Sequence, residues 1–202
     1  PSLYASRYQS GAPGTPRLDQ VMTRNRRVLF EEEGLTSYTT VVESGGELYL
    51  KVNGKTDASS RGDLRTQALL AHLPMLLHPD PKDALLVGLG SGVSLGAMQD
   101  HPVQHIECVE ILPEVVRAAG HFAEVNGNAL EDGRVQLIVG DGRNHIRHGE
   151  NQFDVIVSHP SNTWIAGMAD LLTQEFFQQA QERLKPAGIA CPWVHAYAMR
   201  TD

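Results

Sequence analysis

The sequence has few cysteines, little positive charge and no long hydrophobic run. Its two cysteines among 202 residues, Cys108 and Cys191, form no CxxC pair and no Cys/His cluster, which excludes a disulfide framework and gives no sign of a metal site. We therefore expect no bound metal and two buried thiols in a reducing, cytoplasmic compartment. No run of eighteen apolar residues occurs, so we expect a soluble chain.

Positive charge is also scarce. Seventeen Lys and Arg face 24 Asp and Glu, which gives a formal net charge of −7. Nucleic acids and anionic membranes attract proteins through a positive field, and this composition does not provide one. We expect no nucleic-acid partner and a small molecule as the substrate.

Three parts of the chain differ in pattern. Residues 1–26 begin with a stretch rich in Ser, Gly and Pro, which predicts a flexible N-terminal segment. Residues 27–62 hold short runs with β-branched and aromatic residues near period two, joined by turns such as Asn53-Gly54. This pattern predicts a small antiparallel β unit. Residues 63–202 form the third part.

The third part alternates strand-like and helix-like segments, which predicts an α/β fold with a doubly wound, Rossmann-like parallel sheet. Because the strand-like runs are continuously apolar, we expect them to be buried on both faces. Such sheets often have one or two further strands, so we expect a domain truncated at its C-terminus. The predicted strands are residues 83–90, 104–111, 134–141, 153–160 and 187–195.

A helix is predicted ahead of the first of these strands. Asp63 is placed to cap it, and Pro74 should kink or shorten it. Helical spacing puts five leucines on one side of it: Leu69, Leu70, Leu73, Leu76 and Leu77.

A glycine-rich turn, GLGSG at residues 88–92, leaves the first predicted parallel strand. Glycines there permit backbone positions and a close ligand approach that a Cβ would obstruct. The spacing GxGxG differs from the GxGxxG dinucleotide fingerprint, and the turn lacks the Lys-Ser/Thr of a phosphate-binding loop. A purely structural tight turn stays open as an alternative.

Polar features follow the next three predicted strands. Glu110 suits the vicinal hydroxyls of a ribose, or is a solvated strand end. Asp141 suits the exocyclic amine of a base, or caps the following helix. Residues 158–162 follow the fourth strand. Since carboxyl ends of parallel strands share one edge, these features predict a nucleoside site without a phosphate handle, which favours S-adenosylmethionine or a relative over NAD or ATP.

On these motifs, and on His72-Leu73-Pro74 and LTQEFFQQAQERLKPAGI, the chain resembles the spermidine and spermine synthase family of aminopropyltransferases over about residues 36–197. The resemblance implies a methyltransferase-like sheet behind an N-terminal β unit, an amine substrate, and S-adenosylmethionine or its decarboxylated form as cofactor. It also implies a homodimer. NGKTDAS, GLGSG and SNTWIAG more closely resemble a branch fused to a membrane transporter-like region, which implies a tether to the inner membrane outside this chain.

The resemblance also implies roles for individual residues. His159 is the candidate catalytic base, with an unperturbed pKa of about 6.5; a plain polar loop residue is the alternative. The implied substrate-binding residues are Asp57, Gln67, Asn162 and Trp164. The implied cofactor-binding residues are Gly88, Leu89, Gly90, Ser91, Gly92, Glu110, Ile111, Asp141, Gly142 and Ser158.

Several of these positions depart from the family's pattern. Asp57 replaces a Gln, Thr66-Gln67 a Tyr-His pair, Ser91 a carboxylate, and His159 and Asn162 two catalytic aspartates. Each lost charged hydrogen bond removes roughly 1.5 to 3 kcal/mol, so we do not expect putrescine as the substrate. Three functions stay open: aminopropyl transfer to an amine, an ordinary S-adenosylmethionine-dependent methyltransferase, and a non-catalytic nucleoside-binding domain of a transporter fusion.

Overall fold

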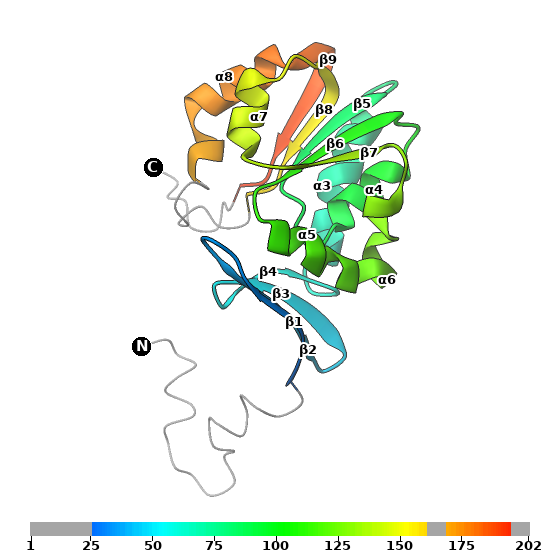
Figure 1. Cartoon of the computed structure of the whole chain (residues 1–202). Coiled ribbons are helices and arrows are strands. Elements are labelled where there is room, and N and C mark those ends of the chain that lie inside the picture. Colours follow the sequence, from blue (N-terminus) through cyan, green and yellow to red (C-terminus); the bar gives the residue numbers. More distant parts are fainter. Residues whose placement is uncertain (1–25, 161–168, 195–202) are drawn as a thin grey trace, which may run out of the picture.

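The structure, a computed structural model, describes residues 26–160 and 169–194 and contains two sheets (Figure 1). The smaller sheet is antiparallel, in the order β1-β2-β3-β4. Asn53 and Gly54 have φ of 52° and 79°, as the tight turn between β3 and β4 requires. The predicted β unit is confirmed. Its strands are β1 (Arg26–Glu33), β2 (Tyr38–Ser44), β3 (Glu47–Val52) and β4 (Lys55–Ser59).

The larger sheet is parallel throughout, in the order β7-β6-β5-β8-β9. The chain runs outward from β5 to β7 and then returns to β8 on the other side of β5. This reversal leaves a crevice at the carboxyl ends of the strands, where open α/β sheets bind ligands. The predicted Rossmann-like class is confirmed. The strands are β5 (Asp83–Val87), β6 (His105–Glu110), β7 (Val135–Val139), β8 (Phe153–Ser158) and β9 (Leu184–Pro192).

Helices cover both faces of the larger sheet. On one face α3 (Leu64–Leu77) and α4 (Val93–Gln99) share a core with β5, β6 and β8; on the other, α7 (Gly142–His148) and α8 (Gln174–Glu182) do so. Within residues 26–160 and 169–194, none of the helices has the length and apolar character needed to cross a membrane. The remaining helical elements are α5 (Pro113–Ala119), η1 (Gly120–Phe122), α6 (Ala123–Asn126), η2 (Ala129–Glu131) and η3 (Ala169–Leu172).

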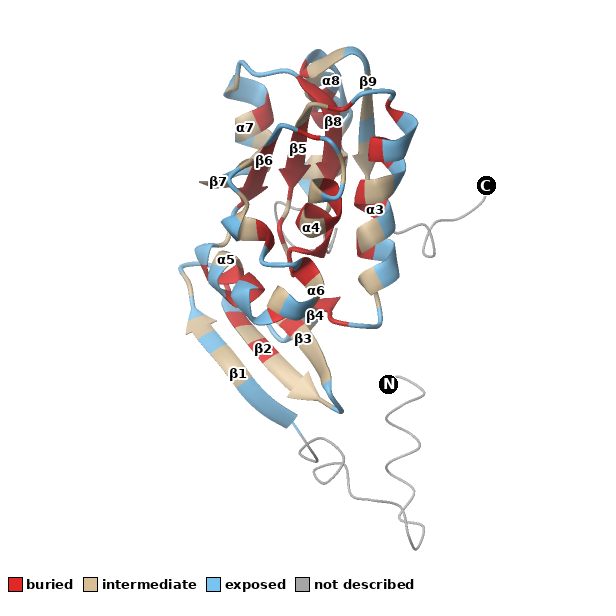
Figure 2. Cartoon of the chain, turned by 90° about the vertical axis from the view of Figure 1, so that its right-hand side faces the viewer, coloured by how far each residue is buried: buried red, intermediate tan, exposed pale blue. Residues whose placement is uncertain are grey.

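The two sheets meet through α5 (Figure 2). Val115 and Phe122, near the two ends of the α5–η1 segment, pack against Val41 and Leu50 of the small sheet, and all four side chains are nearly inaccessible. This apolar cluster holds the small sheet next to the carboxyl ends of the strands of the large sheet. It therefore positions the two walls of the cavity described below.

Several details differ from the sequence-based predictions. The helix α3 continues through Pro74 to Leu77 and is not shortened by it. Asp63 occupies the N-cap position, but its carboxylate accepts hydrogen bonds from Ser59 and Gln67 and makes no capping bond. The reason is local, since these partners lie four positions away, at the end of β4 and in the next turn of the helix.

The buried side of α3 is also not the predicted leucine side. Leu69, Leu73, Leu76 and Leu77 are 53 to 73% exposed. Leu70, Ala71 and Met75 face the sheet instead. The helix has apolar residues on both sides, and the smaller Ala71 lets it lie close to the strands.

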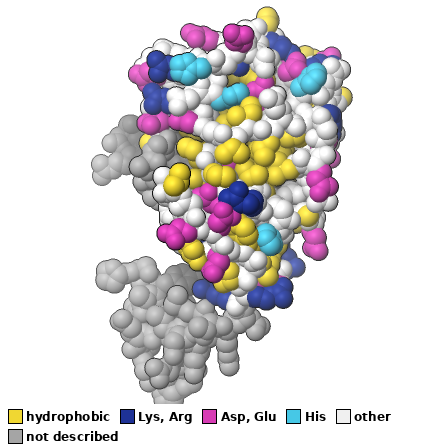
Figure 3. All heavy atoms as spheres, viewed as in Figure 1, with side chains coloured by type: hydrophobic (Ala, Val, Ile, Leu, Met, Phe, Trp, Pro, Cys, Tyr) yellow, Lys and Arg dark blue, Asp and Glu magenta, His cyan; other side chains and the backbone are white. Residues whose placement is uncertain are grey.

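The edge strand β7 is not buried on both faces. Leu137 and Val139 are 36% and 55% exposed, and hydrophobic side chains gather across the middle of the face seen in Figure 3. An edge strand with no helix packed over its end keeps apolar side chains in contact with solvent, although its sequence reads like that of a central strand.

Candidate nucleoside site

A cavity of about 600 Å³ lies between the small sheet and the carboxyl ends of β5, β6, β7 and β8. Its lining combines apolar side chains from both sheets with a few carboxylates and one glycine-rich turn. Cavities that hold small ligands have this size and this mixture of groups. The strands β3 and β4 therefore cover the crevice that was predicted at the edge of the large sheet.

The glycine-rich turn presents backbone to this cavity. Gly88 and Gly90 line it, with φ of 94° and 56°. A Cβ on Gly90 would meet nothing within 4 Å, so open space faces it, whereas a Cβ on Gly88 would lie 2.9 Å from the carbonyl oxygen of His159. Glycine at 88 thus lets the loop after β8 approach the turn, and glycine at 90 leaves room for a ligand.

The other residues of the turn point elsewhere. Leu89 is part of the core beside α3 and α4. Gly92 packs against Asn126, whose amide donates to the carbonyl oxygen of Ser91 at 2.8 Å. The Ser91 hydroxyl is fully buried and donates to the side-chain oxygen of Gln67 at 2.6 Å. The structure therefore places Leu89, Ser91, Gly92 and Gln67 in the interior, outside the lining of the cavity.

Glu110 stands in the cavity wall with its carboxylate already partly used. One oxygen accepts from the backbone N–H of Leu89 at 2.9 Å, and the other from that of Leu112 at 3.0 Å. Burial raises the pKa of Glu110, and these backbone donors oppose that rise. The backbone N–H groups of Gly90 and Ile111 oppose that rise too, so the carboxylate of Glu110 holds the glycine-rich turn in place at the cavity wall.

Asp141 caps the following helix, one of the two roles that its sequence position suggests, and it also lies in the cavity wall. Its carboxylate accepts from the backbone N–H of Arg143 at 2.8 Å and caps α7, while Asp141 and Gly142 also line the cavity. A Cβ on Gly142 would clash with the side chain of Val87. The start of α7 is therefore pressed against the end of β5, which holds Asp141 at the cavity wall.

The remaining predicted residues divide into three groups. Asp57, Ile111 and His159 line the cavity, and the ring of His159 meets that of Trp193 edge to face at 6.2 Å. Ser158 is buried and does not line the cavity, and within the described ranges its hydroxyl has no hydrogen-bond partner. Asn162 and Trp164 lie outside the described residues.

Sequence reasoning missed several residues of the lining. Ser37 and Asn53 come from the small sheet, where Asn53 was read only as a turn residue. Arg143 and Asp170 also line the cavity, and they form an ion pair at 3.5 Å. A charged pair separated by 27 positions gives no signal in one sequence.

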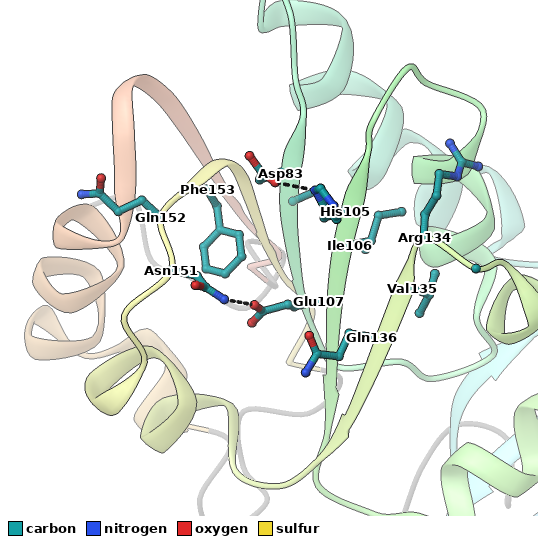
Figure 4. A pocket seen from close by; sticks show the side chains of 12 residues that line it. Asp83, His105, Ile106, Glu107, Arg134, Val135, Gln136, Asn151, Gln152 and Phe153 are labelled. Carbon is teal, nitrogen blue, oxygen red and sulfur yellow. Dashed lines mark hydrogen bonds and ion pairs between the residues drawn. The ribbon is translucent and has the colours of Figure 1, made fainter.

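A second cavity, of about 480 Å³, lies at the amino ends of the same strands (Figure 4). Asp83, His105 and Glu107 belong to its lining, and none of the residues predicted for cofactor or substrate does. Its charged groups are already paired, as in the His105–Asp83 contact at 3.0 Å. The predicted site residues that reach a cavity therefore meet in the first cavity and not in the second.

Together, the parallel sheet, the glycine-rich turn and the acids after β6 and β7 define a Rossmann-like protein of the methyltransferase-fold class. The chain belongs to the spermine/spermidine synthase family, whose spermine/spermidine synthase domain matches residues 64–200. It is 30% identical over 152 residues to a spermidine synthase of Dictyostelium discoideum, covering 72% of this chain and 53% of that protein.

Solved structures show the same likeness. The spermidine synthase of Thermotoga maritima has a TM-score of 0.73 and 26% identity, over 81% of this chain and 56% of that one. A spermidine synthase in complex with the transition-state analogue AdoDATO has a TM-score of 0.69 and 26% identity, over 79% of this chain and 53% of that one. The chain spans about half the length of the curated relatives it matches.

Proposed function

We propose that the first cavity binds an S-adenosyl nucleoside, in its decarboxylated form, and that the chain takes part in aminopropyl transfer to an amine. One observation carries the proposal: Gly88, Glu110 and Asp141, from three different strand ends, line the same cavity. Family membership and the neighbour bound to AdoDATO support the donor. Open space at Gly90 and a carboxylate in the wall beside it fit a nucleoside.

The residues have distinct tasks in this proposal. Glu110 accepts from the ribose hydroxyls, and Asp141 accepts from the exocyclic amine of the base. The bound sulfonium supplies an electrophilic carbon. His159, in the cavity wall, accepts the proton that the amine loses as its nitrogen bonds to that carbon and the carbon–sulfur electron pair returns to sulfur. Asp57 offers a carboxylate to the remaining positive charge of the acceptor.

Calorimetry with decarboxylated S-adenosylmethionine tests the donor assignment. Glu110→Gln should weaken binding by about 1.5 to 3 kcal/mol, because a charged acceptor is lost. Glu131→Gln, an equivalent change in η2 away from the cavity, should leave the dissociation constant unchanged. An unaltered dissociation constant for Glu110→Gln removes the ribose role.

His159→Gln tests the proton acceptor. It should lower kcat more than donor affinity, because a glutamine keeps a polar group in the wall but takes up no proton. Equal losses of rate and affinity indicate a binding or structural role for His159.

A methyltransferase is the second candidate, and the Ser91–Gln67 pair favours it. Each residue replaces a polar group of the family's pattern, and their side chains bond to each other in the interior at 2.6 Å, so neither offers a charge to a diamine. Binding of S-adenosylmethionine without binding of the decarboxylated form would select this candidate.

The cellular location and the assembly of the chain are proposals too. We propose a cytoplasmic location, supported by two cysteines without a disulfide. A homodimer and a fused membrane region remain predictions of the family resemblance.

A further inference from the structure

The short helix α7 connects the nucleoside site to a buried charged cluster. It has seven residues, Gly142–His148, and is therefore about 10 Å long. Asp141 caps its start at the first cavity. Because α7 is only about two turns long, contacts along it restrict the position of Asp141 at its start.

Glu107 is the centre of this cluster. It lies in the middle of β6 and is only 7% exposed. Its carboxylate contacts His145 Nε2 of α7 at 2.6 Å and accepts from the side-chain amide of Asn151 at 2.5 Å. Figure 4 shows Glu107 and Asn151 pointing toward one another beside the second cavity. A carboxylate in a buried strand needs such partners, because an unpaired buried charge is costly.

Arg183, at the end of α8, contacts backbone carbonyl groups at the C-terminal end of α7. It is 6% exposed, and its guanidinium donates to the carbonyl oxygen of Ile146 at 3.1 Å and to that of Asn151 at 2.5 Å. Burial lowers the pKa of Arg183, and the charge of Glu107 opposes that effect. A cation on the last carbonyls of a helix also stabilises its dipole.

Gly149 makes this arrangement possible. A Cβ at position 149 would clash with the guanidinium of Arg183 and lie 2.8 Å from the carbonyl oxygen of His145. Because its φ is −71°, any residue can adopt its backbone conformation, so the demand for glycine is one of space alone.

We infer that Glu107, acting through His145, is a positioning residue of the nucleoside site: it holds the middle of α7, one turn from Asp141, and thereby places Asp141 against the ligand. The inference rests on the proposed function and extends it to a buried residue in the middle of β6. Glu107 does not line the first cavity, so its effect on the ligand must pass through α7.

A double-mutant cycle with decarboxylated S-adenosylmethionine as the calorimetric probe tests the inference. Glu107→Gln should raise the dissociation constant about tenfold, the size of effect found within shared networks. In an Asp141→Asn background the same change should have little further effect, because the residue through which it acts is gone. The control Glu150→Gln removes a charge from an exposed position beside α7 and should leave affinity unchanged.

Gly149→Ala gives a second route that alters no charge. It should displace Arg183 and weaken binding in the same direction as Glu107→Gln. An unchanged dissociation constant in both variants overturns the inference, and so does a Glu107→Gln effect that adds fully to that of Asp141→Asn.

Hydrogen exchange separates this inference from the proposed function. The amides of Arg143 and Asn144 donate to Asp141, and their exchange should become faster in Glu107→Gln without any ligand, while exchange in β5 stays unchanged. If the wild type binds no adenosyl ligand, the proposed function fails. Unaltered exchange at Arg143 and Asn144 then rejects the positioning role by itself.

Discussion

At Gly88 the backbone has a φ of 94°, and the carbonyl oxygen of His159 occupies the space where a side chain would begin. Gly88→Ala combines strain with a clash, and we expect it to reduce the free energy of unfolding by about 1 to 3 kcal/mol. The loop after β8 must also move, so affinity for the adenosyl ligand should fall. Thermal unfolding and calorimetry measure the two effects.

The matched control for Gly88→Ala is Gly133→Ala. A Cβ at Gly133 meets nothing within 4 Å, and its φ is not positive. Gly133→Ala should leave both stability and affinity near those of the wild type. Equal behaviour of the two variants would show that the turn at Gly88 tolerates a side chain.

Because of Glu110, we expect the free energy of unfolding and the affinity for the ligand to change with pH in opposite directions. Burial raises its pKa above 4.5, so the folded state favours the protonated acid, and the cost of the buried charge appears as pH rises through 4.5 toward the folded pKa. Ligand binding uses the carboxylate, so affinity should decrease as pH falls through that raised pKa. Calorimetry between pH 8 and 5 measures it.

The control for this pH profile is Glu110→Gln, which cannot titrate at this position. Its affinity should be lower and should not show the Glu110-dependent decrease. If wild type and Glu110→Gln show parallel profiles, another group is responsible for the pH dependence.

Single residues also show the limits of sequence reasoning. Glu110 and Asp141 were predicted at the strand ends, and both line the cavity. The prediction succeeded because the carboxyl ends of parallel strands all lie at the same edge of the sheet. The family resemblance implied contacts of Ser91 with the cofactor and of Gln67 with the substrate, yet the two side chains bond to each other in the interior. The direction of a side chain in a glycine turn depends on which helix packs beside it, and that is a tertiary property.

At the scale of elements, α3 provides a direct comparison of its two apolar sides. Leu70 is 7% exposed and Leu76 is 73% exposed. Leu70→Ala should reduce the free energy of unfolding by about 2 to 5 kcal/mol, because it leaves a cavity in the core. Leu76→Gln should change it by no more than about 0.5 kcal/mol. Urea denaturation measures both, and a larger loss for Leu76→Gln would mean that the exposed side packs against something.

The helix α3 also shows why the order of helices and strands was easier to predict than which side of a helix is buried. Strand and helix alternation follows from local hydrophobic spacing, and β5 to β9 appear in the predicted order. In α3, however, leucines lie on the exposed side and Leu70, Ala71 and Met75 on the buried side, so periodicity leaves its rotation undetermined. The segment after β6 forms α5, η1 and α6 in succession.

At the scale of the whole molecule, the ligand cavity depends on the docking of two sheets, which no local pattern in the chain specifies. Ser37 of the small sheet donates to the carboxylate of Glu114 on α5, and Glu114 is 2% exposed. Arg117 of α5 also pairs with Glu32 of β1 at 2.7 Å. These contacts lie 77 and 85 positions apart in sequence, so the lining from Ser37 and Asn53 could be found only in three dimensions.

Ser37→Ala tests whether the small sheet is a separate cooperative unit. Without the hydroxyl, the buried carboxylate of Glu114 loses a donor, which costs about 1 to 3 kcal/mol. If the small sheet opens by itself, hydrogen exchange should become faster in residues 26–59 while β5 and β8 keep the protection of the wild type. Ser44→Ala, at the far end of β2, should change neither region. Faster exchange in both sheets would instead mean that the two sheets unfold as one unit.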